Sequence, residues 1–260
     1  MCEIRFEFLR PPRAWCGDRL LQLGPARQQG VLAVLALNAN REFTSDELLT
    51  AAWDEDEPPS GAKVVASYIY RIRNLLPCPD LLRTVPHGYQ LCLRTDQTDV
   101  GQLEALLKEA RTARAASNFE YAAGRLAAAL DLFGGEPLGG LPGRYLESQR
   151  RKLRELHRQV QCERIDLVIR LGGLTDALAE LVEVATQDPL DERLAGLLMH
   201  AWYLDGRPSS ALDVYRRTRN ALVQELGIEP GPELRSLHWA ILSNTVGAAC
   251  CNHHCTKRAG

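Results

Sequence analysis

Residues 60–93 read SGAKVVASYIYRIRNLLPCPDLLRTVPHGYQLCL, and this stretch decides the fold of the N-terminal part. Apolar residues in its first half recur at spacings of four, three and four, which predicts one buried stripe along a helix over residues 60–76. They are Val65, Ile69, Ile72 and Leu76. The opposite side is polar and contains no carboxylate; it carries Lys63, Ser67, Tyr70 and Asn74, with Arg71 at its edge. Pro77 and Pro79 end the helix.

Two short β-prone runs follow this helix. Residues 81–85 (LLRTV) and 89–93 (YQLCL) flank Pro86-His87-Gly88, which indicates a hairpin. A helix followed by a hairpin is the order of a winged helix, in which the helix enters the major groove and the wing contacts the DNA backbone. An ordinary surface helix beside a hairpin has the same periodicity, because most amphipathic helices simply present a solvated face.

The amino-acid sequences of the helix and the hairpin favour the winged helix over an ordinary surface helix. SYIYRIRNLL (67–76) and LRTVPHGYQL (82–91) resemble the recognition helix and wing of OmpR-type winged-helix regulators. Within that group the chain is similar to the Streptomyces antibiotic regulatory protein family of pathway-specific activators. Where relatives often carry arginine, this wing has Val85 and Gln90, and His87 stands where they have proline. Fewer cations predict a shallow salt dependence of DNA binding.

The resemblance implies a set of DNA-binding residues. We expect Lys63, Ser67, Tyr70, Arg71 and Asn74 to enter the groove. Arg73 lies nearer the core side, and we expect it to reach a phosphate by extending its stem. We expect Arg83, Thr84 and His87 to contact the backbone.

The residues before the helix predict a small sheet and two further helices. Ile4, Phe6 and Phe8 alternate with charged residues, which is typical of a half-buried strand, and a hairpin is expected around Gly17-Asp18. A helix beginning at Pro25 brings Arg27 and Gln28 to its first turn, where both could donate to a phosphate.

A second helix begins at the capping box Thr44-Ser-Asp-Glu47. Trp53 on this helix is expected in the core rather than on a base. The four acids that follow are Asp54, Glu55, Asp56 and Glu57. Such a run is usually a solvated loop, and it cannot face DNA because anions repel phosphates. In OmpR-type activators the corresponding loop faces RNA polymerase, so the resemblance suggests a polymerase contact here.

Residues 95–99 read as a short polar linker, and the pattern after it is helical. Ala177, Leu181 and Val184 recur as Ala211, Tyr215 and Thr218, a displacement of 34 residues that matches the tetratricopeptide period. Three segments, DPLDERL (188–194), LDVYRR (212–217) and QELGIEPGPEL (224–234), resemble the bacterial transcriptional activator domain.

These patterns predict a mainly α fold with a small β component: an OmpR-type winged helix-turn-helix (1–95) and an all-α, tetratricopeptide-like activator domain (96–245). Residues 246–260 are expected to form a disordered tail. The tail contains Cys250-Cys-Asn-His-His-Cys255, whose adjacent ligands fit a disordered terminus better than a zinc site, where paired ligands stand two to four residues apart.

Composition limits the partners. The 260-residue chain has a net charge of −2, so no global basic footprint indicates nucleic acid, and the specific face must supply the affinity. No apolar run is long enough to span a bilayer and no signal-peptide core is present, which predicts a cytoplasmic protein without a membrane partner.

The sequence predicts neither an enzyme nor a cofactor or metal, because phosphate-loop, His-Glu-x-x-His and Gly-x-Ser-x-Gly motifs are absent. The resemblance implies a transcriptional activator of a biosynthetic gene cluster. The resemblance implies a homodimer on direct DNA repeats and contact with RNA polymerase and its sigma factor. The alternatives are a helical-repeat adaptor with weak DNA binding and a ligand-sensing regulator with a small molecule in the repeat groove.

Overall fold

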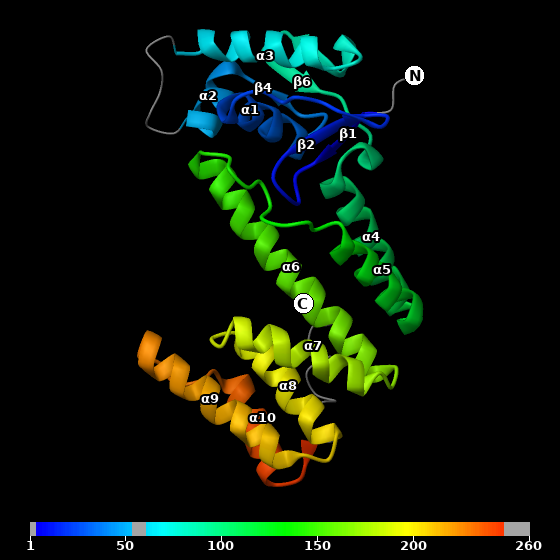
Figure 1. Ribbon diagram of the computed structural model, residues 1–260, viewed down its shortest axis with the longest axis vertical. Coiled ribbons are helices and arrows are strands. Elements are labelled where there is room, and N and C mark those ends of the chain that lie inside the picture. Colours follow the sequence, from blue (N-terminus) through cyan, green and yellow to red (C-terminus); the bar gives the residue numbers. More distant parts are fainter. Residues whose placement is uncertain (1–3, 54–60, 247–260) are drawn as a thin grey trace, which may run out of the picture. The chain divides into compact units, whose positions relative to one another are not determined.

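The computed structural model describes residues 4–53 and 61–246, and it is mainly helical with two small sheets (Figure 1). These residues form two compact units that divide between Gln161 and Cys162. The first unit contains, in order, β1 (Ile4–Glu7), β2 (Arg13–Cys16), β3 (Arg19–Leu20), α1 (Ala26–Leu37), β4 (Glu42–Phe43), α2 (Ser45–Trp53), α3 (Lys63–Leu75), η1 (Pro79–Leu81), β5 (Leu82–Val85), β6 (Gly88–Leu91), η2 (Thr95–Gln97), α4 (Asp99–Ala115), α5 (Phe119–Asp131) and the first part of α6 (Arg144–Arg170).

The N-terminal sheet confirms the predicted strand and hairpin. Its strands are antiparallel in the order β1-β2-β3, with Phe6 opposite Ala14. Ile4 and Phe6 are buried while Arg5 between them is exposed. The period of two in the sequence therefore gives β1 one buried face and one solvent-exposed face.

The second sheet, of order β4-β6-β5, contains a strand that the sequence did not reveal. β5 and β6 are the predicted wing, and Val85 pairs with Gly88 across a two-residue turn. β4 adds Phe43 opposite Tyr89 on the other edge of β6. At Gly88, whose φ is +155°, an added Cβ would lie 1.9 Å from the carbonyl oxygen of Phe43. Only glycine therefore lets β4 pair with the wing.

The helices before α3 are built as their sequence predicts. Thr44 and Glu47 form the capping box, in which the Glu47 N–H donates to the Thr44 Oγ1 (3.1 Å) and the Thr44 N–H donates to the Glu47 carboxylate (2.7 Å). The Thr44 N–H and the Thr44 hydroxyl, which both donate to the Glu47 carboxylate, hold its pKa below the ordinary value. Trp53 is 6% exposed and so belongs to the core, as expected.

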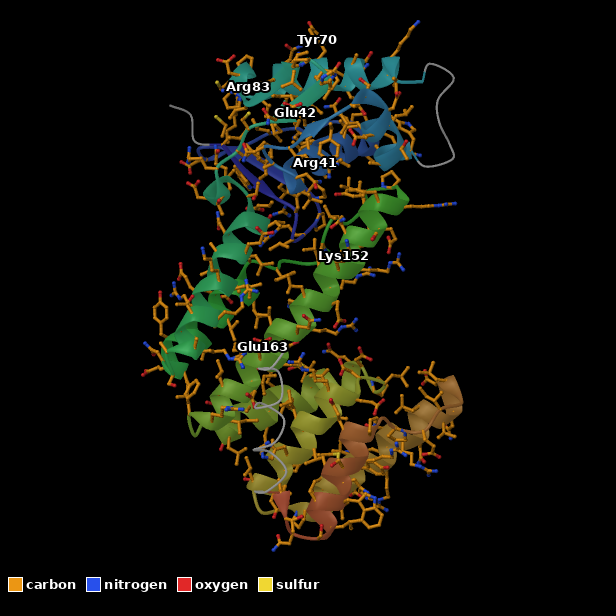
Figure 2. All side chains as sticks on the ribbon, turned by 180° about the vertical axis from the view of Figure 1, so that it is seen from behind. Arg41, Glu42, Tyr70, Arg83, Lys152 and Glu163 are labelled. Carbon is orange, nitrogen blue, oxygen red and sulfur yellow. The ribbon has the colours of Figure 1, made fainter. Side chains whose placement is uncertain are left out.

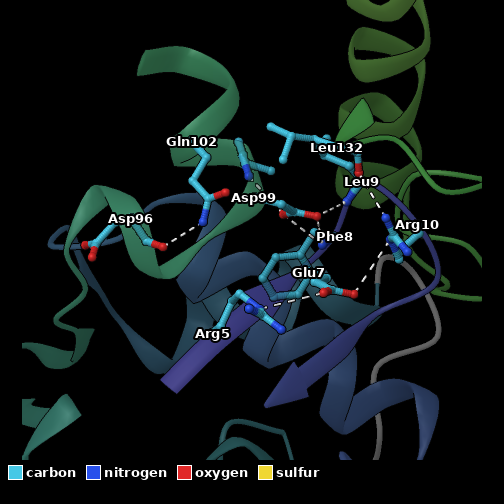
Figure 3. Close-up of polar contacts among 10 residues, drawn as sticks. Arg5, Glu7, Phe8, Leu9, Arg10, Asp96, Asp99, Gln102 and Leu132 are labelled. Carbon is cyan, nitrogen blue, oxygen red and sulfur yellow. Dashed lines mark hydrogen bonds and ion pairs between the residues drawn. The ribbon is translucent and has the colours of Figure 1, made fainter. Parts of the chain in front are cut away.

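The predicted polar linker is exposed at Thr95 and Asp96 but buried at residues 97–99. The Asp99 carboxylate, 5% exposed, accepts hydrogen bonds from three backbone N–H groups (Figure 3): Phe8 reaches both oxygens (2.9 and 2.8 Å), and Leu9 and Val100 reach one each (2.8 Å). Thr98 forms a bridge to Phe6 and caps α4 by accepting from the Gly101 N–H. We call Asp99 with these N–H donors the Asp99 joint; it attaches the start of α4 to the end of β1.

A second attachment joins the same segment to residues 132–141. The Phe8 carbonyl accepts from the Leu138 N–H (2.8 Å). Arg150 on α6 is 9% exposed and donates to the carbonyl oxygens of Pro137, Leu138 and Leu141 at 3.2, 2.8 and 2.8 Å. One buried guanidinium thus donates to three carbonyl oxygens of this irregular loop.

The second unit consists of the rest of α6 and four helices, α7 (Leu174–Gln187), α8 (Glu192–Leu204), α9 (Pro208–Leu226) and α10 (Pro232–Leu242). Ala177 and Ala211 are 1% and 0% exposed in its core, where small side chains allow close helix packing, as the 34-residue repeat predicts. Asp191 caps α8 by accepting from the N–H groups of Arg193 and Leu194 at 2.9 and 3.0 Å.

The predicted tail mostly lies outside the described residues, including the whole Cys/His cluster from Cys250 to Cys255. Val246, which we assigned to that tail, is 2% exposed and packs in the core of the second unit. The predicted boundary at residues 95/96 and the compact-unit division at 161/162 are different divisions, since α4, α5 and the start of α6 belong to the first unit.

Candidate DNA-binding surface

The surface of α3 is divided as the sequence periodicity predicts. Val65, Ile69 and Ile72 are at most 1% exposed and face α1 and α2. The outer side carries the exposed residues Lys63, Ser67, Tyr70, Arg71 and Asn74. Tyr70 is 68% exposed and points outward from the helix (Figure 2). Because α3 contains no acidic residue, a phosphate or a base edge meets donors on this face without a repelling charge.

Arg71 is supported from below by aromatic rings. Its guanidinium carbon lies 5.7 Å from the centre of the Tyr68 ring, and that ring lies 5.5 Å from the ring of Trp53. Sequence reasoning missed Tyr68, which is half-buried between the two faces of α3. A stacked guanidinium has fewer accessible rotamers, so Arg71 is partly ordered before any ligand arrives.

The two polar side chains in the first turn of α1 form hydrogen bonds within the protein. Gln28 is 4% exposed, and its Nε2 donates to the Leu23 carbonyl (2.9 Å). Arg27 donates to the Ala52 carbonyl and lies 5.7 Å over the ring of Trp53. The prediction that Gln28 donates to a phosphate is therefore wrong, because its amide is buried and hydrogen-bonded. The guanidinium of Arg27 already contacts the Ala52 carbonyl and the Trp53 ring.

The wing carries the three residues that are predicted to contact the DNA backbone. Arg83, Thr84 and His87 are all exposed. Arg83 lies at the outer edge of the wing (Figure 2) and donates from Nε to the Asp80 carbonyl (3.2 Å). His87 occupies the two-residue turn with Pro86.

Arg73 bridges α3 and the wing instead of extending into solvent. Its Nε donates to the Leu82 carbonyl (2.8 Å) and its Nη2 to the Thr84 hydroxyl (2.7 Å). Its guanidinium carbon lies 5.9 Å from the Tyr89 ring centre. The helix and the wing are thereby held together by one side chain. The four acids Asp54, Glu55, Asp56 and Glu57 lie outside the described residues.

A separate hollow lies in the second unit, between α7, α8 and α9. It has a volume of about 330 Å³, and its walls include Val182, Leu198, Trp202 and Thr218, with Asp188 and Arg217 as charged groups. Within residues 4–53 and 61–246, no three His, Cys, Asp or Glu side chains are grouped as metal ligands would be. The helices of this described part are also all too short or too polar to cross a bilayer.

The outer face of α3 is free of acids, Arg73 bridges this helix to the wing, and helical repeats follow. This arrangement defines the class of winged-helix regulators with a helical activator module. Comparison with known proteins agrees with this class. Residues 21–91 match the family "Transcriptional regulatory protein, C terminal", and residues 98–242 match the "Bacterial transcriptional activator domain".

Relatives that match most of this chain identify one family within this class. The chain is 38% identical to the regulatory protein AfsR of Streptomyces griseus over 239 residues, which is 92% of this chain but 24% of AfsR. It is 31% identical to the regulatory protein DnrI of Streptomyces peucetius, covering 84% of each chain. The structure of Mycobacterium tuberculosis EmbR in complex with a low affinity phosphopeptide superposes with a TM-score of 0.88 at 30% identity, over 96% of this chain and 70% of that one. The chain belongs to the Streptomyces antibiotic regulatory protein family.

Proposed function

We propose that this protein is a sequence-specific DNA-binding transcriptional activator of a biosynthetic gene cluster, working in the cytoplasm. The observation that carries the proposal is the acid-free outer face of α3, fixed beside the donors of the wing. The groove residues are Lys63, Ser67, Tyr70, Arg71 and Asn74, the backbone residues are Arg83, Thr84 and His87, and Arg73 joins α3 to the wing. Since the wing carries few cations, affinity for DNA depends on salt less steeply than in arginine-rich wings.

A mobility shift on a duplex selected from random sequence by the wild-type chain tests this function. Arg71→Ala should cost about 1–3 kcal/mol and relax specificity at one base position. Arg111→Ala, an exposed arginine on α4, is the matched control and should bind as wild type does. A uniform loss over all sequences would make Arg71 a phosphate contact, and failure of the wild-type chain to select or shift any duplex would favour the helical-repeat adaptor.

The dimer is the second part of the proposal. Two recognition helices reach the same side of the duplex when their sites are direct repeats about one helical turn apart, about 10–10.5 base pairs. Inserting half a turn between the repeats should abolish cooperative binding, while a full turn should partly restore it. Equal binding at all three spacings would contradict a dimer on direct repeats.

The third part is contact with RNA polymerase and its sigma factor through residues 54–57. Reversing all four charges (D54K, E55K, D56K and E57K) should lower activation in a purified transcription assay without weakening the mobility shift. Equal loss of both activities would reject the polymerase contact.

A second candidate function is control by a small effector bound in the hollow between α7, α8 and α9. The observation in its favour is the volume of about 330 Å³, within the range of small-molecule pockets, and the largely apolar wall around Trp202. Thermal-shift screening with the products of the regulated pathway tests it, with Trp202→Ala as the control that should abolish any shift.

A further inference from the structure

The Thr84 hydroxyl is oriented by its hydrogen bond to Arg73. A threonine hydroxyl has one hydrogen to donate and two lone pairs that accept. Arg73 Nη2 donates to this oxygen at 2.7 Å, so one lone pair is occupied by a cationic donor. The hydroxyl hydrogen has no acceptor among the described residues, and the side chain is exposed. It is therefore free to donate outward.

Arg73 is itself fixed at three points. It donates to the carbonyl of Leu82, a residue that is 1% exposed, and it lies over the ring of Tyr89, the residue opposite Thr84 in the β5–β6 register. Residues 82 and 84 share one side of the strand, because side chains alternate, and that side faces Arg73. The guanidinium thus links α3 to the wing.

We propose that Arg73 is a positioning residue whose effect on DNA passes through Thr84, and that the Thr84 hydroxyl is the group that donates to a DNA phosphate. This inference rests on the proposed DNA-binding function. A hydrogen bond from a cation withdraws electron density from the hydroxyl oxygen and strengthens the bond that the same hydroxyl donates to an anion.

The salt dependence of binding separates this arrangement from a direct Arg73–phosphate contact. A cation on a phosphate releases counterions and adds about 0.9 to the slope of log K against log salt, whereas a hydroxyl adds nothing. Losing Arg73 should therefore weaken binding without changing the slope. Lysine should replace it poorly, because Arg73 donates to the Leu82 carbonyl and the Thr84 hydroxyl from two nitrogens of one rigid fork, whereas lysine has a single nitrogen on a flexible stem.

The experiment measures binding of the full chain to a fluorescent duplex selected by the wild-type protein, over a salt series. Thr84→Val should weaken binding about ten-fold or more, and Thr84→Ser, which keeps the hydroxyl, should bind nearly as wild type. R73Q and R73K should each weaken binding with the wild-type slope, and R73Q with T84V should be no weaker than T84V alone. Additive losses, or a slope reduced by about 0.9 in R73Q and restored in R73K, would overturn the proposal.

Two controls keep the result interpretable. If the Arg73 variants fail to fold by circular dichroism, the exposed-site pair Thr84→Val and Thr84→Ser carries the test, and equal affinities would overturn it. If the wild-type chain selects no duplex, the proposed function fails. If wild type binds and Thr84→Val binds equally well, only this inference fails.

Discussion

Asp99 makes a specific thermodynamic prediction because its carboxylate is buried and, among the described residues, forms no ion pair with a cation. Burial raises its pKa from 3.8 to about 6, Glu7 adds a smaller repulsion, and the N–H groups of Leu9, Phe8 and Val100 partly oppose the rise. Below pH about 4 the group is protonated in both folded and unfolded chains. As the pH rises, the unfolded chain loses its proton first, so stability is lost between pH about 4 and 6. The rise of the Asp99 pKa from 3.8 to about 6 corresponds to about 3 kcal/mol of unfolding free energy.

The perturbation is Asp99→Asn, which removes the charge but keeps the shape. At pH 7.5 the amide relieves the penalty of about 3 kcal/mol, but its NH₂ group faces one backbone N–H that is left without an acceptor, at a cost of about 1–3 kcal/mol. The relieved burial penalty and the cost of the unpaired N–H nearly cancel at pH 7.5. Near pH 4 the wild-type carboxyl is neutral and no penalty remains to be relieved. The variant should then be less stable than wild type by about 1–3 kcal/mol.

The measured quantity is the difference in unfolding free energy between wild type and Asp99→Asn, in which the other titrating groups cancel. This difference should fall by about 3 kcal/mol from pH 4 to pH 7.5. Urea unfolding is followed by fluorescence in a background with Trp202→Phe and Trp239→Phe, so that Trp15 and Trp53 report the first unit alone. Asp96→Asn is the control: Asp96 is exposed, and its hydrogen bond from Arg94 lowers its pKa, so no loss near pH 6 is expected.

The result that would refute this reasoning is a difference that grows as the pH rises. It would mean that the backbone donors to Asp99 outweigh its burial and hold the folded pKa below 3.8. A difference independent of pH would mean that the folded and unfolded pKa values are equal, which would also contradict a desolvated carboxylate.

Three other substitutions test how the fold is held. Gly88→Ala should cost at least about 3 kcal/mol in thermal melts, since its Cβ would strike the Phe43 carbonyl, whereas Gly17→Ala, with φ +58° but open space, should cost about 1–2 kcal/mol. Arg150→Met should cost about 3–5 kcal/mol by urea unfolding, because its ion pairs and three loop carbonyls lose their donor; a loss under 1 kcal/mol would mean that water replaces the guanidinium. Asp191→Ala should cost the second unit about 1 kcal/mol, and an equally unstable Asp191→Asn would contradict its role as a cap.

The elements with a local signal were predictable from the sequence. The α3 stripe of Val65, Ile69 and Ile72 follows from helical period, and the wing follows from two β-prone runs around Gly88. The repeat alanines are buried where the 34-residue period places them. In each case neighbouring residues along the chain carry the pattern, so no knowledge of the tertiary fold is needed.

The features that the sequence did not reveal depend on distant partners. β4 has only two residues, and its pairing with β6 joins positions more than 45 residues apart. Asp99 looks like a solvated linker residue until Phe8 and Leu9, about 90 residues away, supply its donors. The candidate site shows the same limit. Its exposed residues were placed correctly on the outer face of α3, but the bridge from Arg73 to Thr84 exists only once helix and wing meet.

The Asp99 joint also constrains how this family can be recombined. A chimaera cut at residue 95 would separate Phe8 and Leu9 from their carboxylate and leave two main-chain donors stranded in an apolar environment. Replacing only the outward side chains of α3 would change the DNA-facing surface of this chain while leaving Phe8, Leu9 and Asp99 in contact.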